Sequence, residues 1–156
     1  MGPTIRAACV ALFLLPAPAL AQTLVDATDP ERIIGLLRGF GSAILESDSV
    51  GDPMIVGRID GTRYLVLFYG CDDGGTGCRA IQFRAAWETD GEYALSDLNA
   101  WNRDKRFGKA YLDDVDDPVL EMDVNLYDSV TTRNLEDTID WWQIVLADFK
   151  RNVLKQ

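Results

Sequence analysis

The chain has 156 residues, of which 25 are acidic and 15 are basic; it contains no histidine, and its formal net charge is −10. This acidity disfavours binding to nucleic acids and anionic lipids, because both rest on clustered lysine and arginine side chains. The lack of histidine removes the usual general base of serine and cysteine hydrolases, and with it a common zinc ligand.

Residues 1–21 follow the pattern of a cleaved secretory signal peptide. A single arginine precedes an apolar stretch, and Ala-Leu-Ala at its end fits the small-x-small motif that signal peptidase recognises. The apolar stretch is too short to span a bilayer, which takes about 20 residues. We expect cleavage near Ala21-Gln22, a periplasmic or secreted protein without stable membrane insertion, and one domain over residues 22–156. An uncleaved N-terminal anchor is the alternative.

Cys71 and Cys78 are the two cysteines of the expected mature chain, since Cys9 lies in the signal peptide. Their spacing is wider than that of a CxxC redox motif. A zinc site would need further ligands, which a chain without histidine or another cysteine does not supply. In an oxidising compartment we therefore expect a Cys71–Cys78 disulfide, which stabilises the fold by about 2.5 kcal/mol through loop closure.

Apolar periodicity and turn residues predict three helices and six strands. The first helix has Asp29 as its N-cap and Pro30 in its first turn, and it ends near Gly39. Asp60-Gly61 is a strong signal for a two-residue hairpin turn. Four strands follow the first helix, at residues 43–48, 54–60, 63–69 and 78–87.

In the second half of the chain we expect a helix with Ser96 as its N-cap and Trp101 facing the core. In the strand after the acidic turn, Leu120 should face inward and Glu121 outward. The elements here are a helix at about 96–106, strands at 110–113 and 119–126, and a helix at about 132–154. The order α-β-β-β-β-α-β-β-α indicates an α+β fold, an antiparallel sheet meander with helices packed on it.

The stretch LNAWNRDKRFGKAYLDDVDDPVLEMDVNL, residues 98–126, closely resembles the signature of the bacterial YbjN family of sensory transduction regulators. The segments GRIDGTRYLVLFYGC, residues 57–71, and CRAIQFRAAW, residues 78–87, are similar to exported members of that family. The residues that carry the resemblance are Asn99, Trp101, Asn102, Arg106, Phe107, the acidic turn that follows and residues 119–123.

The resemblance implies a fold like that of the small type III secretion chaperones, which often form homodimers and bind peptide segments of their partners. It implies no catalytic residue, metal or cofactor that can be transferred to this chain. The signal peptide and the disulfide suit an extracytoplasmic member, so that cytoplasmic roles of relatives need not apply here.

Aromatic and basic residues on the last two predicted helices form a candidate partner surface. Trp141 and Trp142 are adjacent and point about 100° apart on a helix, so both cannot face the core centrally. Most of the helical tryptophans are expected in the core, but one of this pair is expected at the rim, where tryptophan often anchors an interface. Arg103 and Arg106 belong to a basic cluster that either pairs with nearby aspartates or docks an acidic partner; its other members are Lys105 and Lys109.

The sequence leaves two other functions possible, a calcium-responsive protein and an enzyme. The acidic turn at residues 113–118 is either a solvated turn or a calcium site, although it lacks EF-hand spacing. An enzyme would need a carboxylate pair in a cleft, and no motif singles out such a pair. The sequence favours a non-catalytic, chaperone-like binding module that holds a protein or peptide, also as a homodimer.

Overall fold

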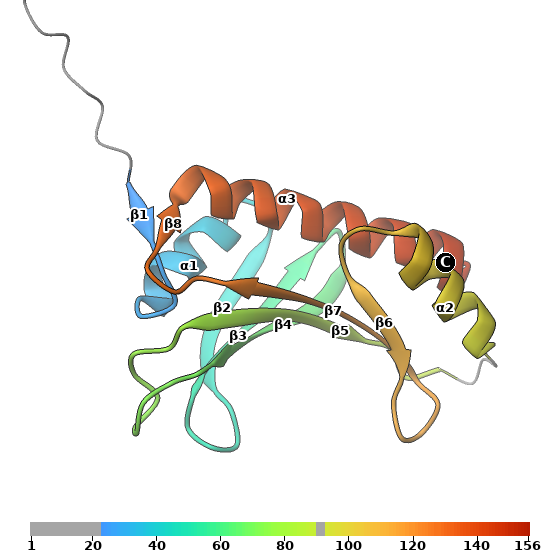
Figure 1. The fold of residues 1–156 in the computed structure, drawn as a ribbon, viewed down its shortest axis with the longest axis horizontal. Coiled ribbons are helices and arrows are strands. Elements are labelled where there is room, and N and C mark those ends of the chain that lie inside the picture. The colour runs from blue at the N-terminus through green and yellow to red at the C-terminus, as the bar shows by residue number, and fades with distance from the viewer. Residues whose placement is uncertain (1–22, 90–92) are drawn as a thin grey trace, which may run out of the picture.

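A computed structural model describes residues 23–89 and 93–156, and the predicted signal peptide and its cleavage site lie outside these residues. The described chain forms a six-stranded antiparallel sheet with three helices packed on one face (Figure 1), which confirms the predicted α+β class. The other face of this sheet carries no helix in the described part of the chain. No helix within the described ranges combines the length and hydropathy needed to cross a membrane.

The predicted order of elements is confirmed, and one short strand pair is added to it. The helices are α1 (Pro30–Leu37), α2 (Leu95–Asp104) and α3 (Thr132–Phe149), which continues as a π-helical segment, Lys150–Leu154. The strands of the sheet are β2 (Ser42–Ser47), β3 (Pro53–Ile59), β4 (Thr62–Tyr69), β5 (Ala80–Ala86), β6 (Lys109–Leu112) and β7 (Pro118–Asn125). Two strands that the sequence did not predict, β1 (Leu24–Val25) and β8 (Val130–Thr131), pair with each other.

The first four strands of the sheet form a meander, whereas the last two do not continue in chain order. The strand order is β2-β3-β4-β5-β7-β6, because α2 carries the chain past the position of β7 to the edge of the sheet. The hairpin between β3 and β4 turns at Asp60 and Gly61, whose φ angles are +47° and +78°. Two successive positive φ angles are typical of a type I′ turn, so the predicted Asp-Gly hairpin is confirmed.

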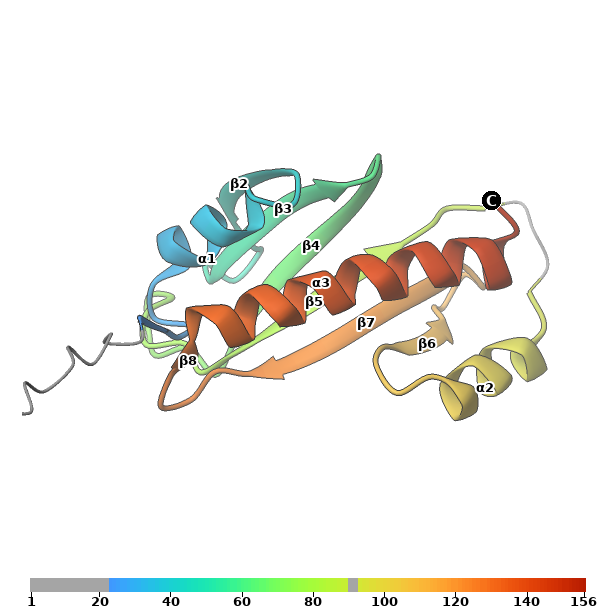
Figure 2. The same ribbon diagram turned by 90° about the horizontal axis from the view of Figure 1, so that it is seen from above.

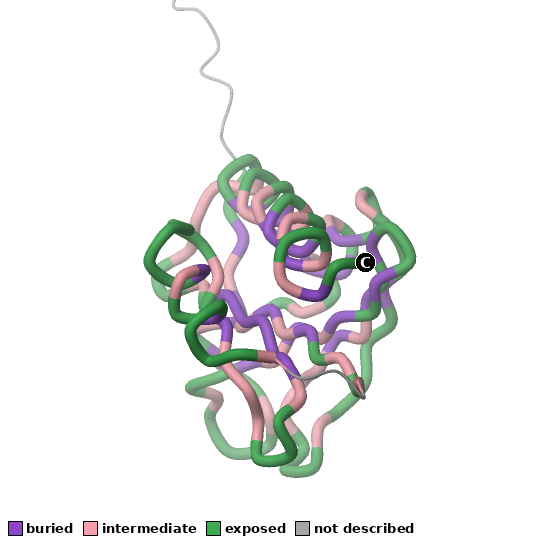
Figure 3. Tube along the Cα trace, turned by 90° about the vertical axis from the view of Figure 1, so that its right-hand side faces the viewer, coloured by how far each residue is buried: buried purple, intermediate pink, exposed green. Residues whose placement is uncertain are grey.

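The core lies between the sheet and α3 (Figure 3), where the buried residues gather. At its centre the ring of Trp142 is 6.1 Å from that of Tyr64 and 5.4 Å from that of Phe83. All three side chains are at most 1% exposed, so these aromatic contacts hold α3 on the middle of the sheet. The buried face of α3 consists of Leu135, Ile139, Trp142, Val145, Leu146 and Phe149.

Gly57 allows this aromatic centre to form. It lies opposite Tyr64 in the β3–β4 ladder, and a Cβ at position 57 would overlap the tyrosine ring. The absence of a side chain lets the ring of Tyr64 lie over the backbone of β3. Burial raises the pKa of Tyr64 to about 12, and its hydroxyl has no hydrogen-bond partner among the described residues.

The second helix starts and ends earlier than expected. Its N-cap is Ala94 instead of Ser96, because the Ala94 carbonyl already accepts hydrogen bonds from the backbone N–H groups of Asp97 and Leu98. The helix ends at Asp104, so the basic residue Arg106 follows it in a loop. Trp101 faces the core as expected and is 4% exposed.

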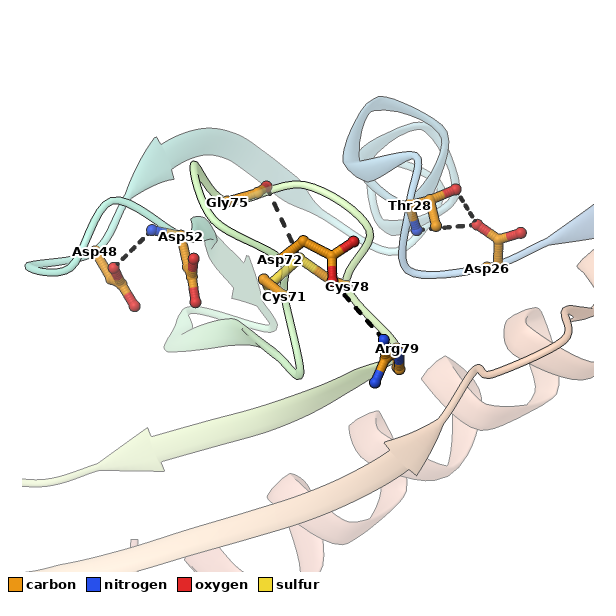
Figure 4. Close-up of a disulfide and its surroundings, with 9 residues drawn as sticks. All are labelled: Asp26, Thr28, Asp48, Asp52, Cys71, Asp72, Gly75, Cys78 and Arg79. Carbon is orange, nitrogen blue, oxygen red and sulfur yellow. Dashed lines mark hydrogen bonds and ion pairs between the residues drawn. A yellow bond between two sulfur atoms is a disulfide. The ribbon is translucent and has the colours of Figure 1, made fainter.

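The disulfide between Cys71 and Cys78 closes the loop that joins β4 to β5 (Figure 4), as the sequence predicts. At the base of this loop the Arg79 N–H donates a 2.9 Å hydrogen bond to the Tyr69 carbonyl. A Cβ at Gly75 would lie 2.7 Å from the Gly51 carbonyl oxygen, so the loop packs closely against the β2–β3 turn. The disulfide therefore cross-links the two ends of the β4–β5 hairpin loop, which packs against the β2–β3 hairpin.

Candidate functional site

A groove of about 460 Å³ lies between α2, the loop after it and the outer side of α3, and we call it the α2–α3 groove. It joins the two regions that the sequence singled out, the basic cluster and the Trp141 face of the last helix. The residues that line it are Trp101, Asp104, Lys105, Arg106, Phe107, Trp141, Ile144, Val145, Ala147, Asp148 and Arg151.

The position of α2 creates this groove. The side-chain amide of Asn102 donates a 2.9 Å hydrogen bond to the Ala110 carbonyl and accepts one of 2.8 Å from the Ala110 N–H. Asn102 therefore pairs with the outer edge of β6 as a further strand would, and it fixes α2 beside that edge (Figure 2). Trp101 packs edge-on against Phe149, with ring centroids 5.1 Å apart, and holds the same helix against the end of α3.

The floor of the groove is apolar and partly exposed. The rings of Phe107 and Trp141 are 4.9 Å apart, and Phe107 is 36% exposed. Ile144 lies one turn further along α3 and is 54% exposed, although an isoleucine is usually buried. These three side chains offer a bulky apolar group a place to bind.

The adjacent tryptophans have separate roles. Trp142 is fully buried in the core, whereas Trp141 is half-buried and lines the groove. The sequence predicts that one of the pair lies at a rim, but only the packing of α3 on the sheet identifies it as Trp141. Trp142 is therefore not available as a contact residue in this structure.

The basic cluster separates into residues with different partners. Lys105 lines the groove and forms a 2.6 Å ion pair with Asp148. Arg103 does not line the groove, but it pairs at 2.8 Å with the adjacent Asp104, which does. The hydrogen bond from Arg103 lowers the pKa of Asp104. Arg106 has no carboxylate within 4.0 Å among the described residues, and its guanidinium lies 5.3 Å from the centre of the Phe107 ring.

Lys109 belongs to another charge cluster, on the face of the sheet that carries no helix. Its ammonium group lies 2.8 Å from Glu121, which also accepts a 2.7 Å hydrogen bond from Tyr111 and lies 3.4 Å from Arg84. Glu121 points outward as predicted, yet it is only 6% exposed because these three side chains cover it. Burial raises the pKa of Glu121, but the hydrogen bonds from Lys109 and Tyr111 and the nearby positive charges outweigh burial and lower it overall. The cluster therefore ties β5, β6 and β7 together.

The acidic turn at residues 113–118 uses its first carboxylate to close the turn. One oxygen of Asp113 accepts 3.0 Å hydrogen bonds from the N–H groups of Val115 and Asp117. The turn between β2 and β3 has the same construction, with Asp48 bonded to residues 50 and 52 at 2.9 and 3.0 Å. Both turns read Asp-x-Val-x-Asp-Pro, so the shared turn structure follows from a six-residue pattern that occurs twice in the sequence. Among the described residues no group of three or more His, Cys, Asp or Glu side chains is placed to hold a metal ion.

A comparison with protein families gives the chain its classification. A search of curated proteins finds no match. The profile of the YbjN family, described as "putative bacterial sensory transduction regulator", matches residues 29–155. This match covers α1 to the end of the π-helical segment and includes every residue that lines the α2–α3 groove. The chain belongs to the YbjN family.

Proposed function

We propose that this protein is a non-catalytic binding module of an extracytoplasmic compartment, which holds a protein or peptide segment in the α2–α3 groove. The observation that carries the proposal is the partly exposed apolar floor of Phe107, Trp141 and Ile144 inside a groove of about 460 Å³. Concave, mostly apolar sites with a few polar groups at their rim are typical of ligand binding. The regulatory description of the family agrees with a protein that acts by binding.

Two features support the extracytoplasmic location. The N-terminal sequence has the pattern of a signal peptide, and the Cys71–Cys78 bond needs an oxidising environment to persist. The proposal assigns no catalytic residue, metal or cofactor. Glu121, the most buried carboxylate of the described residues, is consistent with this, since its contacts with Lys109 and Tyr111 join neighbouring strands.

The proposal is tested by photo-crosslinking from inside the groove. A photoreactive amino acid replaces Ile144 in the full-length protein, and the same amino acid at Tyr127, which is 70% exposed and far from the groove, serves as the control. We expect a defined peptide-containing adduct from position 144, which is lost on adding Trp141→Ala. Equal labelling from both positions, or an adduct that persists with Trp141→Ala, would refute binding in the groove.

A homodimer is part of the proposal, and strand β2 supports it. Its outer edge has no strand partner in the described sheet, and it carries Ile44 and Leu45, which are 61% and 37% exposed. Such an edge is a template for pairing with another chain, and antiparallel pairing of two copies gives a two-fold dimer. Sedimentation velocity should give a dimer that dissociates with Leu45→Lys; a wild-type monomer at high protein concentration would exclude it.

A further inference from the structure

We propose that the α2–α3 groove selects a peptide segment in which a bulky apolar side chain is flanked by carboxylates, and that Arg106 and Arg151 recognise this negative charge. The inference rests on the proposed function and adds the chemistry of the partner. It follows from the balance of charges around the groove.

The groove inverts the charge balance of the chain. Its lining contains three basic residues and two acidic ones, whereas the whole chain has 15 basic and 25 acidic residues. Both aspartates of the lining are already engaged, because Asp104 pairs with Arg103 and Asp148 pairs with Lys105. Asp148 also accepts a 2.6 Å hydrogen bond from Asn152.

Two guanidinium groups remain for a ligand. Neither Arg106 nor Arg151 has a carboxylate within 4.0 Å among the described residues, and both line the groove. Arginine binds a carboxylate through two parallel N–H donors, which makes it the residue of choice for this ligand group. The contact of Arg106 with the Phe107 ring limits the freedom of its guanidinium, so less entropy is lost on binding.

The apolar floor adds the second requirement. Phe107 adjoins Arg106 in the loop after α2, and Trp141 and Ile144 lie on α3, which continues into the segment that carries Arg151. Because the same groove is lined by these apolar groups and by both arginines, a ligand with an apolar side chain on the floor can place neighbouring carboxylates near the guanidinium groups. A volume of about 460 Å³ accommodates an anchor residue and its neighbours rather than a long helix. The remaining surface is acidic and repels carboxylates, so recognition depends on charges that lie next to the anchor.

The test uses three synthetic peptides with the same central phenylalanine, flanked by aspartates, by asparagines or by lysines. Binding to the full mature protein is measured by fluorescence anisotropy of the labelled peptides. We expect the aspartate peptide to bind about tenfold more tightly than the asparagine peptide, and the lysine peptide to bind most weakly. An Arg106→Glu, Arg151→Glu variant should reverse this order.

Arg63→Glu is the matched control, since Arg63 is exposed on β4, has no carboxylate within 4.0 Å among the described residues and lies outside the groove lining; it should keep the order of the three peptides. Circular dichroism verifies that each variant folds. Equal affinity for all three peptides, lost with Ile144→Lys, would overturn the charge recognition and leave the proposed function standing. No binding of any peptide at about millimolar concentration would overturn both.

Discussion

Replacing the adjacent tryptophans by alanine, one at a time, should affect different properties of the protein: its stability at Trp142 and its peptide binding at Trp141. Trp142→Ala removes a fully buried side chain that contacts Tyr64 and Phe83 at the centre of the core. Trp141→Ala removes a half-buried side chain whose aromatic partner, Phe107, is itself partly exposed. We expect the first substitution to destabilise the fold strongly, and the second to weaken peptide binding with little loss of stability.

The size of the effect at Trp142 follows from its burial. A buried aromatic side chain removes up to about 250 Å² from water, which corresponds to about 6 kcal/mol at about 25 cal/mol per Å². The indole N–H of Trp142 has no acceptor among the described residues, so its removal relieves a desolvation cost of about 1–3 kcal/mol. The net loss of about 3–5 kcal/mol agrees with large-to-small substitutions in other cores. Since domains are stable by about 5–15 kcal/mol, the variant retains only part of its stability.

Urea denaturation followed by far-UV circular dichroism measures both variants under the same conditions. Trp142→Ala should lower the free energy of unfolding by about 3–5 kcal/mol, and Trp141→Ala by about 1 kcal/mol or less. Equal losses for the two variants, or a loss below about 1 kcal/mol for Trp142→Ala, would refute the packing of α3 described above.

Four further measurements test individual contacts. Tyr64→Phe should raise the free energy of unfolding by about 1 kcal/mol, because the buried hydroxyl has no partner in the described residues; a comparable loss in a urea titration would mean that an acceptor exists. Glu121→Gln should cost about 1–2 kcal/mol at neutral pH. The pKa of Glu121 is lowered from its ordinary value of 4.5, so the stability that its carboxylate contributes is present above pH 4.5 and is lost as the pH falls through the folded-state pKa. If the unfolding free energies of wild type and variant change in parallel over this pH range, the ionised Glu121 does not stabilise the fold. Reduction of Cys71–Cys78 should cost about 2.5 kcal/mol, and an unchanged thermal midpoint with dithiothreitol would show that the loop needs no covalent bond. Asn102→Asp should weaken binding of the aspartate peptide severalfold, because the new carboxylate faces the Ala110 carbonyl and displaces α2. An unchanged affinity would mean that Asn102 does not position this helix.

Local patterns in the sequence were sufficient for the fold class, the three helices and the six strands of the main sheet, but not for the short β1–β8 pair. The N-cap Asp29, the Asp60-Gly61 turn and the apolar seam of α3 each act within a few residues, so their structure follows from neighbouring side chains. The disulfide was also predictable, because Cys71 and Cys78 lie in one short loop. The boundary at Ala94 was not predictable in the same way, because no side chain caps the start of α2 and the sequence therefore contains no cap residue that marks it.

The sequence by itself determined the α+β class, the alternation of helices and strands, the disulfide and the family resemblance, since these depend on short-range periodicity and motifs. Only the tertiary structure decided that β6 lies at the edge, that Trp142 is in the core and Trp141 in a groove, and that Arg106 keeps no acidic partner among the described residues. These features depend on contacts between elements that are far apart in the chain, such as Trp142 with Tyr64 and Phe83, and Trp101 with Phe149. Local propensity does not encode such contacts, because they form only when the helices pack on the same sheet.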